Sequence, residues 1–378
     1  MDEFEFIVIG AGMAGASVAC ELSEHATVLL LEQESQPGYH STGRSAALFA
    51  ETYGNRTIRA LTSGSRAFYL DPPRGFTEHP LLTPRGALFI ARPDQTESLD
   101  RLLEEVAGLR SNIHRLDGRQ ATNMVPTLKS DYVADAVVDP DAMDIEVHGL
   151  LHGYLRGFRA RGGKLVADGG VQALERDAQG WSVRTRTGGA YRGQVVVNAA
   201  GAWADEVAGL AGAQPVGLTP KRRTAILFAA PTDVDSKPWP LVIDADEQFY
   251  FKPDAGKLLA SPADETPVPP CDIQPEELDI AILVDRLQQA TDLTIPRIEH
   301  SWAGLRTFAT DKTPVVGFDS ELSGFFWLAG QGGYGIQTAP AMARLAAALA
   351  RHRPVPSDLA DLGVTTESLA PGRFAAVA

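Results

Sequence analysis

The first thirty-two residues alternate between apolar runs and a glycine-rich interruption. Residues 4–9 form an apolar run of strand length, and the segment 10–15 has the sequence GAGMAG. Small, helix-compatible residues continue through 16–22, and a second apolar run at 26–31 ends at Glu32. Such short apolar runs are typical of buried strands. The pattern therefore predicts a strand, a tight turn, a helix and a second strand, the order of a βαβ unit.

Comparable patterns occur in the middle and near the end of the chain. VVVNAAGAWAD at 195–205 predicts a buried strand followed by a turn and a helix. The run at 325–329 leads into GQGGYGIQ at 330–337 and an alanine-rich helix at 338–351. Helices are also expected at 56–70, 96–108, 147–161 and 275–292, whereas the tract from 109 to 138 is expected to be rich in loops.

These patterns favour an α/β protein (α+β overall) with two interleaved domains. The segments that resemble a dinucleotide-binding domain are separated by segments richer in strand, and no linker rich in Pro, Gly or Ser divides them. We expect a Rossmann-type domain built from residues 1–80, 145–214 and 307–378. A second domain with a mixed or antiparallel sheet is expected from residues 81–144 and 215–306.

Composition narrows the class of protein. A length of 378 residues with 44% hydrophobic residues fits two globular domains. The net charge of −14 argues against nucleic acid as a partner, because such binding relies on Lys and Arg. Two cysteines, Cys20 and Cys271, favour a reducing compartment. The acidic start MDEFEF does not resemble a secretory signal, and no apolar run is long enough for a transmembrane segment. A cytoplasmic location is expected, and docking at the inner membrane surface is left open.

The spacing Gly10-x-Gly12-x-x-Gly15 after a strand is a dinucleotide fingerprint. The first glycine permits the tight turn, the second lets the backbone approach a pyrophosphate, and the third permits close packing of helix on strand. Glu32, at the end of the next strand, can accept hydrogen bonds from ribose hydroxyls and would repel a 2′-phosphate. The alternative is a glycine-rich turn without a ligand. These residues do not distinguish FAD from NAD.

A resemblance to a known superfamily favours FAD. EQESQPGYHSTGRSAA at 32–47, VVVNAAGAWAD and GQGGYGIQ resemble the flavin segments of the FAD-dependent amino-acid oxidoreductases, which include D-amino-acid oxidase, glycine oxidase and sarcosine oxidase. Within this superfamily, PKRR at 220–223, FYFKPDAG at 249–256 and SWAGLR at 301–306 are similar to the D-arginine dehydrogenase branch. The resemblance extends essentially from end to end.

The resemblance implies non-covalent FAD, because neither cysteine lies in the C-terminal flavin segment where sarcosine oxidases attach FAD. Gly10, Gly12, Gly15 and Glu32 would contact its adenosine diphosphate part, and Val171 its adenine. The pyrophosphate and flavin ring would lie along Ser41, Thr42, Arg44, Ser45 and Ala46. The pyrimidine end would lie against Gly332, Gly333, Tyr334, Gly335, Ile336 and Gln337.

An amino-acid substrate brings a carboxylate, which in a buried site requires a cationic partner. The resemblance implies that Arg222 and Arg306 bind this carboxylate, with Tyr53 and Tyr250 as hydroxyl partners. Arg223 is an adjacent rival of Arg222. The alternative for each arginine is a surface or interdomain salt bridge, and the alternative for each tyrosine is a structural hydroxyl contact.

Two positions in the side-chain pocket depart from the D-arginine dehydrogenase pattern. Leu48 stands where that pattern has a histidine, and Ala87 where it has a glutamate for the substrate's guanidinium. Without this carboxylate a buried guanidinium would lack a partner. We therefore expect neutral or apolar D-amino acids to be preferred over arginine.

The resemblance implies oxidative deamination of a D-amino acid by a dehydrogenase. A hydride would pass from Cα to flavin N5, and the imino acid would hydrolyse to a 2-oxo acid and ammonia. The electron acceptor stays open between a quinone and a redox protein. The alternatives are an oxygen-using oxidase of glycine, sarcosine or another secondary amino acid, and a non-catalytic flavin-binding subunit. No metal site is expected.

Overall fold

The glycine-rich N-terminal unit forms the centre of the first sheet. In the computed structural model, which describes residues 2–109 and 112–374, β1 (Asp2–Ile9) pairs in parallel with β2 (Val28–Leu31) and with β12 (Ala190–Asn198). The parallel order continues through β9 (Lys164–Val166) on one side and β19 (Phe325–Ala329) on the other. Antiparallel partners extend it: β10 (Val171–Asp177), β11 (Gly180–Thr185) and β18 (Val315–Phe318). This mixed sheet joins three distant parts of the chain.

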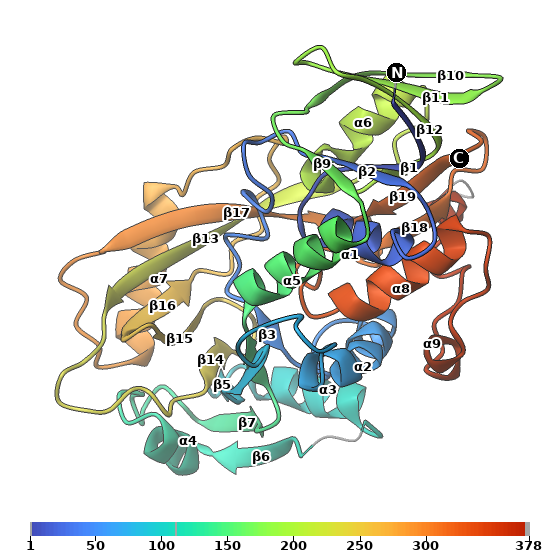
Figure 1. Cartoon of the computed structure of the whole chain (residues 1–378). Helices are drawn as coiled ribbons and strands as arrows, with labels where there is room; N and C mark the ends of the chain where they lie inside the picture. Colours follow the sequence, from blue (N-terminus) through green and yellow to red (C-terminus); the bar gives the residue numbers. More distant parts are fainter. Residues whose placement is uncertain (1, 110–111, 375–378) are drawn as a thin grey trace.

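Helices cover both faces of this sheet (Figure 1). On one face α1 (Met13–Leu22) packs against α5 (Val147–Ala160) and α8 (Ala339–Ala350), and α2 (Arg56–Leu70) packs on α8. The side chains of β1 that point to this face share one core cluster with these helices. The alternate side chains of β1 pack with α6 (Ala204–Ala211) in a separate cluster. This alternation is the period of a strand that is buried on both faces.

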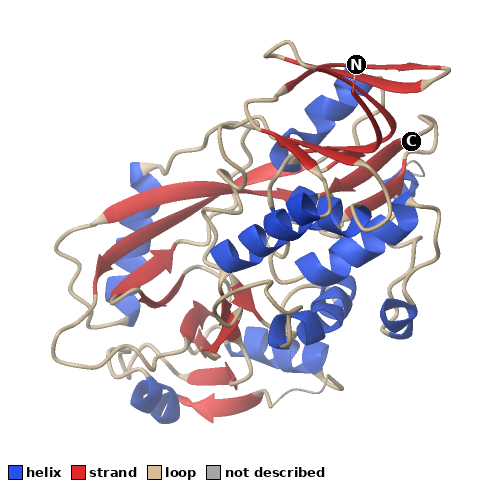
Figure 2. Cartoon of the chain, viewed as in Figure 1, coloured by secondary structure: helices blue, strands red, loops and turns tan. Residues whose placement is uncertain are grey.

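A second sheet lies beside the first and is largely antiparallel (Figure 2). Helix α7 (Glu277–Ala290) shares a core cluster with it, and α3 (Thr96–Val106) packs on its far end. In order, its strands are β17 (His300–Phe308), β13 (Thr219–Ala229), β16 (Lys257–Ser261), β15 (Tyr250–Asp254), β14 (Leu241–Asp244), β5 (Ala87–Ala91), β7 (Asp135–Asp139) and β6 (His114–Asp117). The predicted fold class is therefore confirmed.

The long pair β13 and β17 reaches the first sheet's glycine-rich C-terminal segment. The two strands stay in register from Thr219 opposite Phe308 to Leu227 opposite His300. At the Phe308 end, the N–H of Gly332 donates to the carbonyl of Thr307 over 2.9 Å. The second sheet is thus joined directly to the segment that the sequence assigns to the flavin.

The tract from 109 to 138 was predicted to be loop-rich, and this prediction is wrong for its described part. It contains β6, α4 (Gly118–Met124) and most of β7, and β8 (Met143–Ile145) follows it. β8 forms a small third sheet with β3 (Leu48–Phe49) and β4 (Leu82–Pro84). The elements are too short for their periodicity to be evident. Helix α4 begins at a capping box in which Asp117 and Gln120 exchange hydrogen bonds.

Two further short helical segments follow α8, namely α9 (Ser357–Asp361) and the 3₁₀ turn Pro371–Phe374. Another 3₁₀ turn, Gly201–Trp203, precedes α6. Across residues 2–109 and 112–374, none of the helices combines the length and the apolar character that crossing a membrane would require.

Candidate active site

The glycine turn between β1 and α1 leaves no room for side chains. Gly10 has φ +97°, and a Cβ there would lie 2.5 Å from the carbonyl oxygen of Ala199. A Cβ on Gly15 would lie 1.8 Å from the carbonyl oxygen of Gly10. The turn is therefore possible only because these positions are glycine, which brings the start of α1 against the ends of β1 and β12.

Glu32 supports the same turn from the end of β2. Its Oε2 accepts the N–H of Ala11 at 2.8 Å, and its Oε1 accepts the N–H of Glu34 at 3.0 Å. Burial raises the pKa of this carboxyl group, and the two backbone N–H donors partly oppose that effect. Each carboxylate oxygen retains capacity for a further donor, such as a ribose hydroxyl.

A cavity of about 390 Å³ begins at this turn and follows the first sheet toward β17. Its walls include most of the residues that the resemblance assigns to the cofactor. These are Gly10, Gly12, Glu32, Ser41, Thr42, Arg44, Ser45, Ala46, Val171, Gly332, Gly333, Gly335 and Ile336. A glycine-lined start and a buried acid beside it suit the adenosine diphosphate part of FAD, so the chain fits this cofactor.

Arg44 lines this larger cavity, but its guanidinium is bound to other parts of the chain. Its Nη2 pairs with Asp272 at 2.5 Å, and its Nη1 donates to the carbonyl oxygens of Ile273 and Ala303 at 3.1 and 3.0 Å. It also lies over the ring of Tyr39. These contacts hold the loop that contains Asp272 to a wall of the cavity.

Three residues expected at the cofactor lie outside the cavity walls: Gly15, Tyr334 and Gln337. Gly15 acts through the packing of α1 just described. Tyr334 packs its ring on Tyr53, with 5.0 Å between centroids. Gln337 is 2% exposed, accepts the N–H of Ala50 and donates to Thr62. These contacts give Tyr334 and Gln337 a structural role in holding the segment around residues 50–53.

A second, smaller cavity of about 90 Å³ adjoins the first and shares Ser45, Ala46, Arg223, Tyr250, Arg306 and Gly333 with it. The residues expected at the substrate, Leu48, Tyr53 and Ala87, line this smaller cavity. Apolar side chains that the sequence did not single out complete much of its wall: Ala50, Phe89, Leu241 and Ile243. The lining of the smaller cavity therefore combines apolar side chains with arginines and tyrosines.

Arg306 lies where the two cavities meet. Within residues 2–109 and 112–374 its guanidinium has no ion-pair partner, whereas Arg222 and Arg223 both have one. Burial alone would lower the pKa of Arg306, but Tyr53, Tyr250 and Glu247 together raise it above its ordinary value. The guanidinium is therefore charged and free to bind an anion. Burial also raises the pKa of the Tyr53 phenol, which keeps its proton and can donate.

Arg222 was expected at the substrate carboxylate, but the structure places it in the walls of neither cavity. It is paired with Asp264 at 3.3 Å, Glu276 at 3.0 Å and Asp279 at 2.7 Å. Arg223 lines both cavities instead. Neighbouring residues of a strand point to opposite faces, so only one of the two arginines can face the cavities. The spacing of the sequence does not reveal which one.

Arg223 is held in place by the loop after β16. Its Nε donates to the carbonyl oxygen of Asp264 at 2.9 Å, and its Nη2 pairs with Glu265 at 3.2 Å. Glu265 also pairs with Lys221 at 2.8 Å. Arg223 is thus a cavity residue whose charge is already balanced in part.

Metal binding receives no support from the described residues, which bring together no group of three or more His, Cys, Asp or Glu side chains suited to an ion. His148 and His152 are one helical turn apart on α5, with ring centroids 4.1 Å apart. Such a pair at i and i+4 needs further ligands to hold a metal ion, and the described residues place none beside it.

The comparison with family models identifies the class of this protein. Residues 5–349 match the FAD dependent oxidoreductase family DAO, so the chain belongs to this family and is an FAD-dependent oxidoreductase. FAD is its cofactor, as the sequence predicted. The resemblance to D-arginine dehydrogenase in particular is not among these findings.

The chain is similar to several named proteins at low sequence identity. The chain is 23% identical to a glycine oxidase of Geobacillus kaustophilus over 375 residues, which cover 96% of this chain and 97% of that protein. It is 24% identical to the L-2-hydroxyglutarate dehydrogenase of Escherichia coli over 220 residues, or 56% of this chain, and the match spans about half (51%) of that relative's length. Among solved structures, an L-proline dehydrogenase from P. horikoshii superposes with a TM-score of 0.82 at 20% identity, covering 99% of this chain and 98% of that one.

Proposed function

We propose that this protein oxidatively deaminates D-amino acids and favours neutral or apolar side chains. The observation that carries the proposal is the lining of the smaller cavity. It combines Arg306, which has no ion-pair partner among the described residues, with Leu48, Ala87 and other apolar residues. The carboxylate of an amino acid can bind Arg306, and its side chain can contact the apolar residues of the cavity. Two named relatives, a glycine oxidase and an L-proline dehydrogenase, are named for α-amino acids, of which glycine is achiral and L-proline is the L-enantiomer. The D-enantiomer in this proposal comes from the resemblance to the D-arginine dehydrogenase branch.

The roles of the chain's own residues follow from this arrangement. Arg306 binds the carboxylate with its planar fork, and the phenol hydroxyls of Tyr53 and Tyr250 donate to the same group. Arg223 adds positive charge from the neighbouring strand. Gripping the carboxylate at the meeting point of the two cavities fixes Cα beside the cofactor. FAD, when bound, accepts the hydride that leaves Cα, and the imino acid is then hydrolysed to a 2-oxo acid and ammonia.

The apolar residues that line the smaller cavity support the expected preference for neutral or apolar side chains. Leu48 and Ala87 stand with Phe89, Leu241 and Ile243 around the smaller cavity. Burial of apolar side-chain area against such a wall stabilises a complex by about 25 cal/mol per Å². A kinetic series over D-Arg, D-Lys, D-Met, D-Leu and D-Phe tests this preference, and D-Arg leading the series by a wide margin would contradict it.

We assign the binding of FAD to residues 1–80, 145–214 and 307–378, and substrate binding to residues 81–144 and 215–306. The support is the composition of the two large sheets, which draw their strands from these ranges. Positions 32, 171 and 333, which belong to three separate segments, line one cavity in consequence.

The test is anaerobic reduction of the yellow holoprotein by single amino acids. A D-amino acid with an apolar side chain is expected to bleach the flavin, whereas its L-enantiomer leaves the colour unchanged. Bleaching by the L-enantiomer alone would overturn the assignment of the enantiomer, and no bleaching by either would favour the non-catalytic subunit.

An oxygen-using oxidase is the second candidate, because a glycine oxidase is similar over almost the whole chain. The two candidates differ in what reoxidises the flavin. Hydrogen peroxide formed in step with each turnover in air indicates an oxidase, and its absence with turnover on an added quinone indicates a dehydrogenase.

A further inference from the structure

One acidic side chain of the smaller cavity has no place in the proposed reaction. Glu247 lies in the turn that joins β14 to β15, and it lines the smaller cavity together with Arg306. Its side chain is exposed and has no ion pair or hydrogen bond within the described ranges 2–109 and 112–374. Its φ of +55° is unusual for a residue other than glycine. Such conformations persist only where the surroundings hold them, and they cluster at functional sites.

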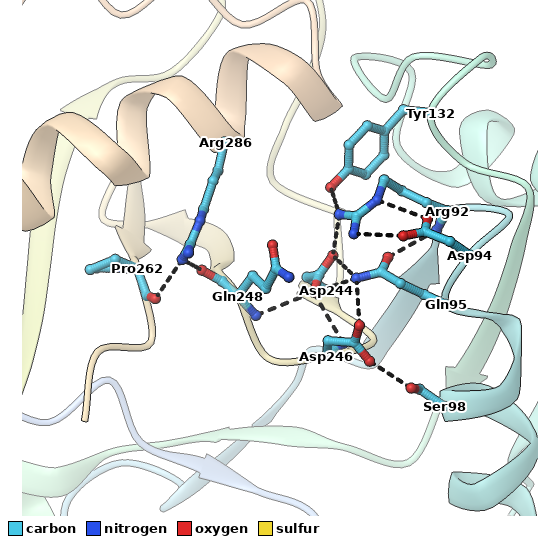
Figure 3. A network of polar contacts seen from close by, with 10 residues as sticks. All are labelled: Arg92, Asp94, Gln95, Ser98, Tyr132, Asp244, Asp246, Gln248, Pro262 and Arg286. Carbon is cyan, nitrogen blue, oxygen red and sulfur yellow. Dashed lines mark hydrogen bonds and ion pairs between the residues drawn. The ribbon is translucent and has the colours of Figure 1, made fainter. Parts of the chain in front are cut away.

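The buried carboxylate of Asp244 is the main contact that holds the turn containing Glu247 in place (Figure 3). Asp244 is 0% exposed, and its Oδ1 accepts the N–H groups of Asp246 at 3.0 Å and of Gln248 at 3.2 Å. Nε2 of Gln95 lies 3.1 Å from both of its oxygens, and Arg92 approaches to 3.8 Å. The carboxylate therefore binds the turn on both sides of Glu247.

Further contacts fix the rest of the turn. Asp246 accepts hydrogen bonds from Gln95 at 3.1 Å and from Ser98 at 2.5 Å, so it points toward α3 rather than the cavity. Arg286 of α7 donates to the carbonyl oxygen of Gln248 at 2.5 Å, as Figure 3 shows. Of residues 245 to 249, Glu247 alone belongs to the walls of the smaller cavity. The network thus holds one carboxylate at the cavity and turns its neighbours away.

The smaller cavity is lined by two arginines and one glutamate, Arg223, Arg306 and Glu247. Arg223 is paired with Glu265, which leaves Arg306 and Glu247 without ion-pair partners in the part of the chain that the structure describes. One free positive and one free negative charge complement the α-carboxylate and the α-ammonium group of one amino acid. A second carboxylate on the ligand would lie near Glu247, where like charges repel.

We propose that Glu247 is a specificity-determining residue that excludes dicarboxylate substrates from the smaller cavity. The inference rests on the proposed function, because it takes Arg306 as the partner of the substrate's α-carboxylate. Asp244 is the positioning residue that holds Glu247 at the cavity. Substrates with acidic side chains are therefore disfavoured, and their neutral amides are accepted.

The experiment compares substrates that differ only in this charge: glutamine with glutamate, and asparagine with aspartate, in the enantiomer that reduces the flavin. In the unaltered protein the ratio of kcat/KM, amide over acid, is expected to exceed about 10, since an exposed pair of charges is screened but still repels. Glu247→Gln should reduce the ratio by about tenfold, to near 1. Glu247→Asp keeps the negative charge and should therefore retain most of the preference for the amide over the acid.

A matched control is Glu104→Gln on α3, because Glu104 is exposed and lines neither cavity. It should leave the ratio unchanged. Added salt should reduce the ratio in the unaltered protein and leave it unchanged in Glu247→Gln. Asp244→Asn should reduce the ratio as Glu247→Gln does. An equal ratio in the unaltered protein and in Glu247→Gln would overturn the inference.

A binding measurement separates this inference from the proposed function. Glutaramate and glutarate have no amine and cannot be oxidised, and their affinities can be measured from the change in tryptophan fluorescence. Tighter binding of glutaramate that is lost in Glu247→Gln supports the role of Glu247 even if no amino acid reduces the flavin. Equal binding of both ligands by the unaltered protein would contradict that role, whatever the protein oxidises.

Discussion

A Cβ at Gly333 would lie 2.8 Å from Nη1 and 3.0 Å from Cζ of Arg306. The absence of a side chain at this position therefore lets the flavin segment and the guanidinium touch. Gly333→Ala should displace the guanidinium and raise KM for the amino acid about tenfold or more, because a bidentate contact depends on its geometry. FAD content should stay normal. The control Gly209→Ala, in open space on α6, should change neither quantity.

Arg306→Lys keeps the positive charge but loses the planar fork. We expect kcat/KM to fall by about 100-fold, which corresponds to roughly 3 kcal/mol. Steady-state kinetics gives the loss, and the visible spectrum of bound FAD shows whether the cavity is intact. A variant with unchanged kcat/KM would show that the carboxylate binds elsewhere.

Replacing each of the adjacent arginines, Arg222 and Arg223, by methionine separates their roles. Arg222→Met leaves Asp264 and Asp279 without their partner and should lower the free energy of unfolding by about 3 kcal/mol, with little change in KM. Arg223→Met should raise KM while the loss of stability is smaller. Thermal unfolding and kinetics of both variants check this, and the reverse outcome would restore Arg222 to the substrate.

The ion pair of Arg44 with Asp272 should make the retention of FAD depend on pH. The hydrogen bond from Arg44 lowers the pKa of Asp272. A carboxyl group with a lowered pKa in the folded state contributes stability above its unfolded pKa of about 3.9, and this contribution is lost as the pH falls through the lowered value.

At neutral pH, Asp272→Asn should therefore release FAD about two- to fivefold faster, within the range of about 1 kcal/mol for exposed pairs. The recovery of FAD fluorescence measures the release. The difference in thermal stability between the variant and the unaltered protein should shrink as the pH falls toward 3. Asp233→Asn, an exposed change away from both cavities, is the control.

Both cysteines lie outside the two cavities: Cys20 is buried under α5 and Cys271 lies near the Asp272 loop. Burial raises the pKa of Cys20 to about 11, so its thiol is a poor nucleophile. Acid precipitation should leave the yellow colour in the supernatant. Flavin that stays with the pellet would contradict non-covalent binding.

The local features of the site followed from the spacing of the sequence, whereas the meeting of distant segments was predicted only through the resemblance. The glycine turn and Glu32 belong to one βαβ unit whose spacing determines its geometry. The choice between Arg222 and Arg223 depends on which face of β13 meets the cavities, which no local pattern records. Glu247 was missed because its position depends on Gln95, some 150 residues away in the chain, and a turn sequence such as DADEQF carries no signal for a cavity.

The paired arginines of β13 also affect how this site can change during evolution. A slip of β13 by one residue along β17 would turn Arg223 away and bring Arg222 to the cavities, so a guanidinium would still be present. Arg306 has no such reserve, because its neighbours on β17 are Leu305 and Thr307. A slip of β13 has a cost of its own, because it would also turn the buried side chains of Ile226 and Phe228 out of their core.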